Sequence, residues 1–334
     1  MAKRLVLIHG RAIKPAKADM EALARTAIGE GLRRAGRDDA AARFDAGAVP
    51  LDLVYYGDIN NDIQAARRPK DREALTAIDP GNGKPCFPIG PLRSAYERTR
   101  QIPAFTRARY RNLLREADDY RFLDEAADFA SLIGALVTFG VLNTLMIRHA
   151  TPDMAEYLTS HDTGSLVRAR LQEKLQPALE AGDDICLLAH SMGAIVGYDV
   201  LWKYSHYSEY AALRALGRRV ALFLTVGCPL GELGVRNNLL DGRYPEAEKY
   251  PRGYIGDWWN FHAEDDYIAH AEKMRVAFAR MRSKGYVGDI RDRHVYNCWA
   301  YVDTQSGRLV ANPHDFYGYL MNQEVGARIG QWLS

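Results

Sequence analysis

The junction in the middle of the chain between a strand-like run and a helix-like run most constrains the fold. Residues 185–189 are all apolar, as in a strand that is buried on both faces. Helical sequence begins at Met192, so only His190 and Ser191 separate the two elements. Gly193 lets the backbone of the helix pass close to its neighbours. This junction predicts one strand–turn–helix unit of an α/β sheet, with Ser191 in the turn.

The same alternation of strand and helix patterns runs through much of the chain. Apolar runs of strand length span residues 5–8, 51–56, 220–226, 258–262 and 294–302. Helical patterns run over residues 17–37, 192–204 and 323–333. This alternation predicts the fold class α/β: a mostly parallel sheet with helices on both faces.

The segment from residue 58 to residue 182 departs from this alternation. It opens with a basic stretch and a loop rich in proline and glycine, and then continues as long helical sequence. We therefore expect a core made of residues 1–57 and 183–334, with residues 58–182 forming a mainly helical insertion or cap.

Within this insertion, residues 129–147 are almost entirely apolar. Their number approaches that of a membrane span. A spanning helix would divide the strands of the sheet between two compartments, which argues against it. A buried helix of the cap is favoured, and a lid or a transient contact with a membrane or lipid is the alternative.

Charge and composition limit the classes of partner that the protein is expected to bind. The 44 basic and 42 acidic residues give a net charge of +2, so no global field recruits nucleic acid or an anionic membrane. The basic stretch 273–284 is interpreted as a solvated face. We expect no nucleic-acid partner, and the composition leaves the oligomeric state open.

Cofactor and targeting signals are missing from the sequence. No cluster has the spacing of zinc ligands and no phosphate-binding loop follows a strand, so we expect no metal and no other cofactor. The four cysteines lack CxxC spacing, which favours free thiols in a reducing compartment. The apolar start of the chain is too short for a signal peptide, and we expect a cytoplasmic protein.

Ser191 has the setting of a catalytic nucleophile. A sharp turn between strand and helix exposes a serine hydroxyl to a base, and the start of the helix favours developing negative charge. The alternative is a serine that only caps the helix. A nucleophile also needs N–H donors for the oxyanion that forms. The backbone of Met192 and, beyond Gly10 at the end of the first strand, the backbone of Arg11 are the expected donors.

The base and the acid should follow later strands, at their carboxyl ends. His314 follows the last predicted strand and precedes the final helix, so it is the expected base. His294 begins a predicted strand and is therefore expected at the opposite edge of the sheet. The loop after residues 258–262 supplies the acid, and spacing alone leaves Asp265 and Asp266 as alternatives.

These stretches together resemble the α/β-hydrolase superfamily, in particular its lipase and serine-esterase branch. The motifs that carry the resemblance lie in residues 5–10, 187–193, 222–230, 259–268 and 313–317. Ala189 stands where Gly is usual in the elbow, Cys228 replaces a serine, and Tyr267 replaces a proline. The resemblance implies that Asp266 is the acid and Asp265 the reserve.

The resemblance implies a serine hydrolase that cleaves an ester through a triad of Ser191, His314 and Asp266 and an acyl-enzyme. The apolar run 129–147 and the pair Trp258-Trp259 suggest a small-molecule ester with an apolar acyl group. The same machinery serves thioesterases and acyltransferases, so the fold does not choose the substrate. A non-catalytic module that binds a lipid or a partner is the alternative from another class.

Overall fold

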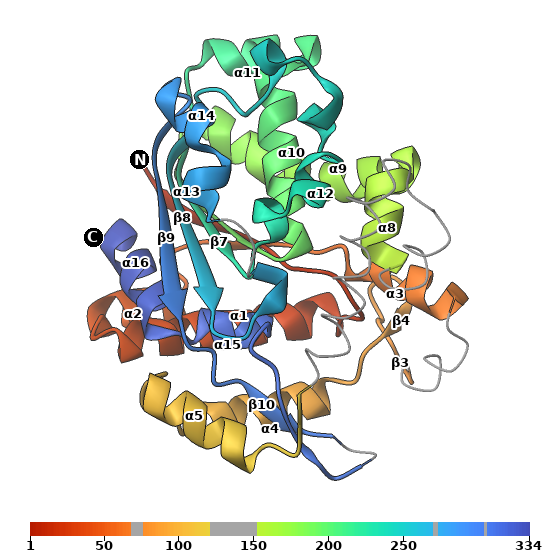
Figure 1. Cartoon of the computed structure of the whole chain (residues 1–334), viewed down its shortest axis with the longest axis vertical. Helices are drawn as coiled ribbons and strands as arrows, with labels where there is room; N and C mark the ends of the chain where they lie inside the picture. The colour runs from red at the N-terminus through yellow and green to blue at the C-terminus, as the bar shows by residue number, and fades with distance from the viewer. Residues whose placement is uncertain (68–75, 121–151, 270–272, 304–305) are drawn as a thin grey trace.

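Six parallel strands form the central sheet of the protein (Figure 1). The computed structural model describes residues 1–67, 76–120, 152–269, 273–303 and 306–334. The strand order is β2-β1-β6-β7-β8-β9. The strands are β1 (Lys3–Ile8), β2 (Leu51–Val54), β6 (Asp184–His190), β7 (Val220–Val226), β8 (Ile255–Ala263) and β9 (Val287–Val295). The prediction of an α/β protein with a parallel sheet flanked by helices is confirmed.

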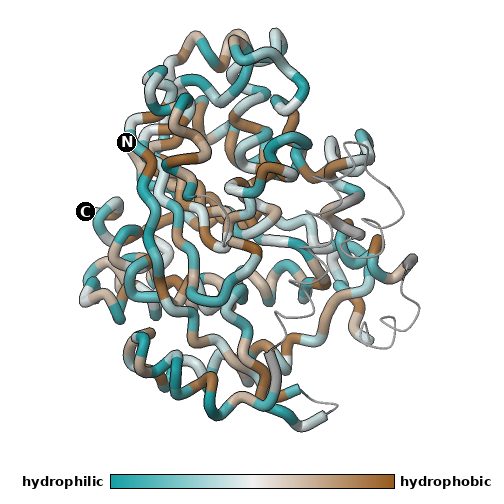
Figure 2. The backbone as a smooth tube through the Cα atoms, viewed as in Figure 1, coloured by the Kyte–Doolittle hydropathy of each residue, from teal (hydrophilic) through white to brown (hydrophobic). Residues whose placement is uncertain are grey.

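Both faces of this sheet are buried, which explains the long apolar runs in β1, β6 and β7. In β1, Leu5 and Leu7 join one hydrophobic cluster, whereas Val6 and Ile8 join the cluster on the other face. Side chains alternate between the faces of a strand, so each face needs its own helical cover. Figure 2 shows hydrophobic residues gathered along the strands in the middle of the molecule.

Helices from the two ends of the chain cover one face of the sheet. They are α1 (Lys17–Arg34), α15 (Phe316–Leu320) and α16 (Gln323–Leu333), whose buried residues share a cluster with Leu5 and Leu7. Helices α9 (His161–Ala181) and α10 (Met192–His206) contribute to the opposite cluster. Figure 1 shows these two groups on opposite sides of the strands.

The remaining helices are short or peripheral. They are α2 (Asp38–Asp45), α3 (Gly57–Arg67), α4 (Ile89–Arg100), α5 (Arg107–Glu116), α8 (Pro152–Thr159), α11 (Ala211–Ala215), α12 (Leu233–Arg236), α13 (Met274–Ala277) and α14 (Ala279–Ser283). Two small sheets pair β3 (Ala77–Ile78) with β4 (Pro85–Cys86), and β10 (Ala300–Val302) with β11 (Leu309–Ala311) and β5 (Asp119–Tyr120).

The described part of residues 58–182 is mainly helical, as expected, and α9 packs against β1 and β2. The apolar segment 129–147 lies outside the described residues. No helix in the described ranges is long and apolar enough to cross a membrane. The division of the chain into a core and an insertion stays a prediction. All four cysteines are buried free thiols.

The predicted sixth strand was wrong. Residues 294–302 do not form one strand: β9 ends at Val295, and β10 belongs to a separate sheet. The true edge strand, β9, was missed because charged residues and a histidine occupy positions 289 and 291–294, and only Val287, Ile290 and Val295 are buried. Charged side chains at a sheet edge discourage pairing with other chains and also obscure the apolar pattern of a strand. The first helix also ends earlier than predicted, at Arg34.

The strand order places one particular crevice at the centre of the molecule. From β1 the chain moves to β2 on one side, and later returns to β6 on the other side of β1. Ligands of open α/β sheets bind where the order reverses in this way, beyond the carboxyl ends of the strands. The ends of β1 and β6 carry Gly10 and Ser191, so the predicted nucleophile lies at this reversal point.

Candidate active site

Ser191 occupies a strained turn between β6 and α10. Its backbone has φ 53° and ψ −124°, a conformation that residues other than glycine rarely adopt. Such a conformation costs on the order of 1–3 kcal/mol and persists only where the surroundings enforce it. One such restraint is a hydrogen bond of 3.1 Å from the Ser191 N–H to the carbonyl oxygen of Val226 on β7.

Two glycines allow the backbone to close tightly around this turn. A Cβ atom on Gly193 would lie 2.5 Å from the carbonyl oxygen of His9. A Cβ on Gly10 would lie 2.8 Å from both His190 Nδ1 and Ser191 Cβ. The end of β1 and the start of α10 therefore touch at the serine, which explains the small residues that the sequence has there.

His314 and Asp266 join Ser191 in a chain of hydrogen bonds. His314 Nε2 lies 3.0 Å from Ser191 Oγ, and His314 Nδ1 lies 3.0 Å and 2.9 Å from the two carboxylate oxygens of Asp266. The three residues are 3%, 7% and 1% exposed for Ser191, His314 and Asp266, so water competes little for these bonds. They follow β6, β11 and β8, which are distant in sequence.

The structure separates the two carboxylates that spacing left open. Asp266 faces His314, whereas Asp265 accepts a hydrogen bond of 3.0 Å from the hydroxyl of Tyr110 on α5. Asp265 has φ 58°, so the chain turns sharply at this residue. The two neighbouring carboxylates therefore contact different elements, and only Asp266 contacts the imidazole.

His190 and Asn297 hold the loop that carries His314. The Nε2–H of His190 donates to the carbonyl oxygen of His314 at 2.9 Å. Burial, with His314 nearby, lowers the pKa of His190 well below its usual value, so this ring stays neutral. Asn297 Nδ2 donates to the carbonyl oxygens of Pro313 and Asp315 at 2.9 and 3.0 Å. The backbone is thus fixed at His314 and on both sides of it.

The two predicted oxyanion donors lie beside the serine turn. Met192 is the first residue of α10, a position whose N–H has no partner inside the helix. At the end of β1, His9 Nδ1 lies 2.7 Å from the carbonyl oxygen of Gly10, and its Nε2 accepts from the Tyr56 N–H at 3.1 Å. Burial lowers the pKa of His9 to about 3, so the neutral ring donates to Gly10.

This bond sets the direction of the next peptide. The C=O and N–H of a trans peptide point in opposite directions, so the Arg11 N–H points away from the His9 ring. The role of Arg11 and Met192 as donors to an oxyanion stays a prediction.

Three further residues contact the site, and none of them was predicted to be a site residue. Tyr319 on α15 donates a hydrogen bond of 2.5 Å to Asp266 Oδ2, and Asn297 clamps the loop as described. Gly227 has φ 56°, and a Cβ there would lie 2.9 Å from His314 Cε1. Gly227 belongs to the motif in residues 222–230, but no role was predicted for it. No spacing rule pointed to Tyr319 or Asn297, because each acts across the fold.

One histidine was misplaced. His294 was expected at the amino end of a strand, but it lies near the carboxyl end of β9, next to the site loops. Its Nε2 lies 2.5 Å from Glu264 Oε2. The error follows from the misplaced sixth strand. His294 is exposed and paired with Glu264, whereas His314 is buried against Ser191.

Elsewhere the described residues offer little that resembles a cofactor site. They contain no group of three or more His, Cys, Asp or Glu side chains that could hold a metal ion. A cavity of about 520 Å³ lies at the far end of α10, between Trp202, His206 and Tyr244. It does not include Ser191 or His314.

Comparisons of the chain with protein-family models, with curated proteins and with solved structures gave no match. The fold is therefore described at the level of an α/β protein with a six-stranded parallel sheet.

Proposed function

We propose that this protein is a serine hydrolase of the α/β-hydrolase type that cleaves an ester through a covalent acyl-enzyme. The hydrogen-bonded chain from Ser191 Oγ through the His314 imidazole to the Asp266 carboxylate carries the proposal. Its support is geometric: nucleophile and base lie within hydrogen-bond reach, and a third group orients the base. The strained turn at Ser191 and its place at the reversal of strand order add to this support.

The proposed reaction has two halves. Ser191 Oγ forms a bond to the acyl carbon as His314 Nε2 takes the hydroxyl proton and the carbonyl electron pair moves to oxygen. The oxyanion is held by the N–H groups of Met192 and Arg11. Its collapse breaks the bond to the leaving alcohol, which receives the proton from His314. Water then attacks the acyl-enzyme in the same way and releases the acid.

Asp266 orients the base throughout this sequence. Its contact with Nδ1 fixes the tautomer of His314 and stabilises the imidazolium that forms when the proton leaves Ser191.

The acyl group is a separate question. Trp258 is fully buried in the core, and its Nε1–H donates to Thr225 Oγ1. The indole of Trp259 lies against the guanidinium groups of Arg291, Arg293 and Arg328. Neither indole supports an apolar acyl group, so this part of the proposal rests on the sequence of residues 129–147 alone.

Labelling with a fluorophosphonate probe tests the proposal directly. We expect the folded protein to be labelled covalently, and Ser191→Ala to lose the label completely, because the probe bonds only to an activated serine. His314→Ala should slow labelling by a factor of about 10³ or more. Ser165→Ala is a matched control on α9 and should leave labelling unchanged. Equal labelling of Ser191→Ala and the wild type would refute the assignment.

A chain-length series of nitrophenyl esters and thioesters then defines the substrate class. Hydrolysis that needs Ser191 and rises with acyl length indicates an esterase for apolar acyl groups. Labelling without hydrolysis of any ester indicates transfer to an acceptor other than water, or a narrow substrate range. An inert, unlabelled protein would favour the non-catalytic alternative.

A further inference from the structure

The Asp266 carboxylate is bound by more than His314. Tyr319 Oη lies 2.5 Å from Oδ2, and the backbone N–H of Ile268 lies 3.2 Å from Oδ1. His314 Nδ1 is within 3.0 Å of both oxygens. Asp266 is 1% exposed and Tyr319 is fully buried. The phenol and the imidazole therefore share one carboxylate oxygen in a region that water does not reach.

The direction of the Tyr319 hydroxyl bond is determined by a second contact. The backbone N–H of Ala263, the last residue of β8, donates to Tyr319 Oη at 2.8 Å. The phenol oxygen thus accepts from the backbone, and its own proton is left for Asp266. One hydroxyl links the end of β8 to the acid that follows it.

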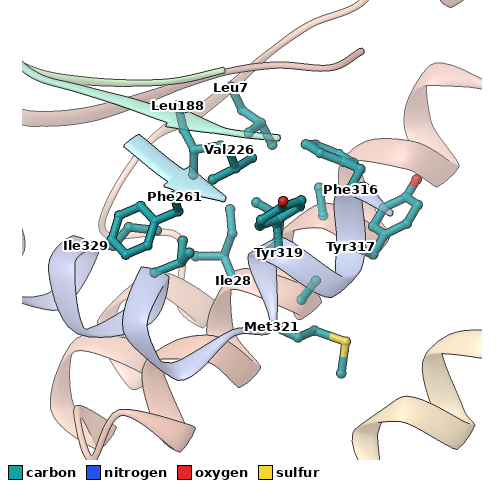
Figure 3. Close-up of a cluster of buried hydrophobic side chains, with 14 of the residues drawn as sticks. Leu7, Ile28, Leu188, Val226, Phe261, Phe316, Tyr317, Tyr319, Met321 and Ile329 are labelled. Carbon is teal, nitrogen blue, oxygen red and sulfur yellow. The ribbon is translucent and has the colours of Figure 1, made fainter. Parts of the chain in front are cut away.

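The Tyr319 ring is held in place by the core. Figure 3 shows it projecting from α15 among the side chains of Val226, Phe261 and Ile28, whereas Tyr317 projects in a different direction. These side chains belong to the same buried cluster as Tyr319. Since α15 begins two residues after His314, the element that carries the base also carries the phenol that holds the acid.

We infer that Tyr319 is a positioning residue for the proposed triad: its hydroxyl fixes the Asp266 carboxylate against His314. This inference rests on the proposed function. A buried carboxylate needs hydrogen-bond donors to remain charged. Tyr319 supplies one such donor to Asp266 Oδ2.

Removal of the hydroxyl has two effects on the protonation of the site. The carboxylate loses a donor, so its protonation becomes easier. Without the phenol, the charge of the Asp266 carboxylate interacts more strongly with the imidazole. Protonation of His314 therefore becomes easier. The triad works only with Asp266 ionised and His314 neutral, so both effects move the acid limb of the pH–rate profile to higher pH.

Other titratable groups face this pair and must be common to every variant compared. His190 and Asp315 interact with His314, Lys14 interacts with His190 and Asp315, and Cys228 and His262 interact with Asp266. Burial raises the pKa of Asp315 to about 7, so its titration contributes to the same pH range. A control on α15 that leaves Asp315 untouched is therefore needed.

Tyr317→Phe is that control. Tyr317 is buried on the same helix, and its hydroxyl has no hydrogen-bond partner among the described residues. Labelling of Ser191 by a fluorophosphonate is followed against pH for the wild type, Tyr319→Phe and Tyr317→Phe. Tyr319→Phe should react about tenfold more slowly at neutral pH, with the acid limb displaced upward. Tyr317→Phe should match the wild type.

A second substitution strengthens the hydrogen bond from position 319 to Asp266 instead of removing it. A ring-fluorinated tyrosine at position 319 keeps the hydroxyl and makes it a stronger donor. The acid limb should then move to lower pH. Because this variant keeps the hydroxyl, it also tests the inference if Tyr319→Phe does not fold. A rate loss in Tyr319→Phe with an unmoved acid limb, together with no effect of fluorination, would show that Tyr319 only packs and would overturn the inference.

Proton NMR separates this inference from the proposed function. The His314 Nδ1 proton bound to Asp266 can be titrated without any substrate. If the wild type is not labelled by the probe, the hydrolase proposal fails. A higher titration midpoint for His314 in Tyr319→Phe still supports the positioning role, and an identical midpoint overturns it.

Discussion

At the scale of single residues, the site contains backbone conformations that cost free energy, so neighbouring contacts must hold them in place. Ser191 has positive φ without being glycine, and so has Asp265, the neighbour of Asp266. Non-glycine residues with positive φ persist where the surrounding structure over-determines them, which is often at functional sites; Ala12 and Tyr250 also have positive φ. The bond from Ser191 N–H to Val226 is one of the contacts that keeps the turn strained.

Asp315 connects the stability of the protein to pH at this scale. Its carboxylate accepts from the N–H groups of Tyr317 and Gly318 as the N-cap of α15, and burial raises its pKa from 3.8 to about 7. Between these values the folded state keeps a proton that the unfolded chain has lost. The contribution of Asp315 therefore stabilises the protein below about pH 4 and is lost as pH rises to about 7.

The substitution Asp315→Asn should remove this dependence, because asparagine caps the helix without titrating. Relative to the wild type, the unfolding free energy of the variant should rise by up to about 1.4 kcal/mol per pH unit across that range. Urea unfolding at a series of pH values measures the difference. A difference between the two proteins that stays constant with pH would contradict this expectation.

At the scale of elements, the contact between β1 and α10 determines where the serine lies. Gly193 approaches the carbonyl oxygens of His9 and Ile8 too closely for any side chain. Ile8 is the last residue of β1, which pairs on both sides, and His9 follows it directly, so these carbonyls cannot easily move away. Four residues later Gly197 faces Phe223, a side chain that can shift.

Gly193→Ala should therefore lower the free energy of unfolding by about 2 kcal/mol and slow the labelling of Ser191. Gly197→Ala is the matched control: alanine favours the helix by about 1 kcal/mol, which offsets a small shift of Phe223. Chemical denaturation and probe labelling of both variants provide the measurement. Equal stability of the two variants would show that the close approach is relaxed in solution.

At the scale of the whole molecule, the two ends of the chain pack together beneath the site. A Cβ on Gly326 of α16 would overlap the carbonyl of Gly31 on α1, and a Cβ on Gly31 would overlap the carbonyl of Leu320. Lys3 and Trp332 both bond to Asp184 at the start of β6. The loop with His314 and helix α15 are thus anchored through α16 on the first helix of the chain.

Gly326→Ala should separate α1 from α16 and lower the unfolding free energy by about 2 kcal/mol or more. Labelling of Ser191 should slow as well, because α15 precedes α16 directly. Gly330→Ala, one turn further on, would meet Arg37 Cγ at 2.7 Å rather than backbone, and should lower stability less than Gly326→Ala does. Thermal unfolding distinguishes the two. A tolerated Gly326→Ala would mean that the terminal helices do not anchor the site.

The sequence by itself predicted the parallel sheet and placed Ser191 and the acidic loop 264–266 beyond the ends of two of its strands, whereas the strand predicted before His314 was wrong. The hydrophobic run 220–226 matches its strand residue for residue, because a strand buried on both faces is almost continuously apolar. The edge strand β9 could not be found in this way, because solvent and charge replace the core at a sheet edge. Ser191 and His314 were chosen from local patterns and chain order.

Only the tertiary structure decided which groups meet. It turned Asp266 to His314 and Asp265 to Tyr110, a choice that spacing left open because adjacent residues differ only in the direction of their side chains. It also brought Tyr319 to Asp266 across 53 residues and Asn297 to the loop of His314. Such contacts depend on how helices and loops pack around the sheet, and no local period or motif encodes them.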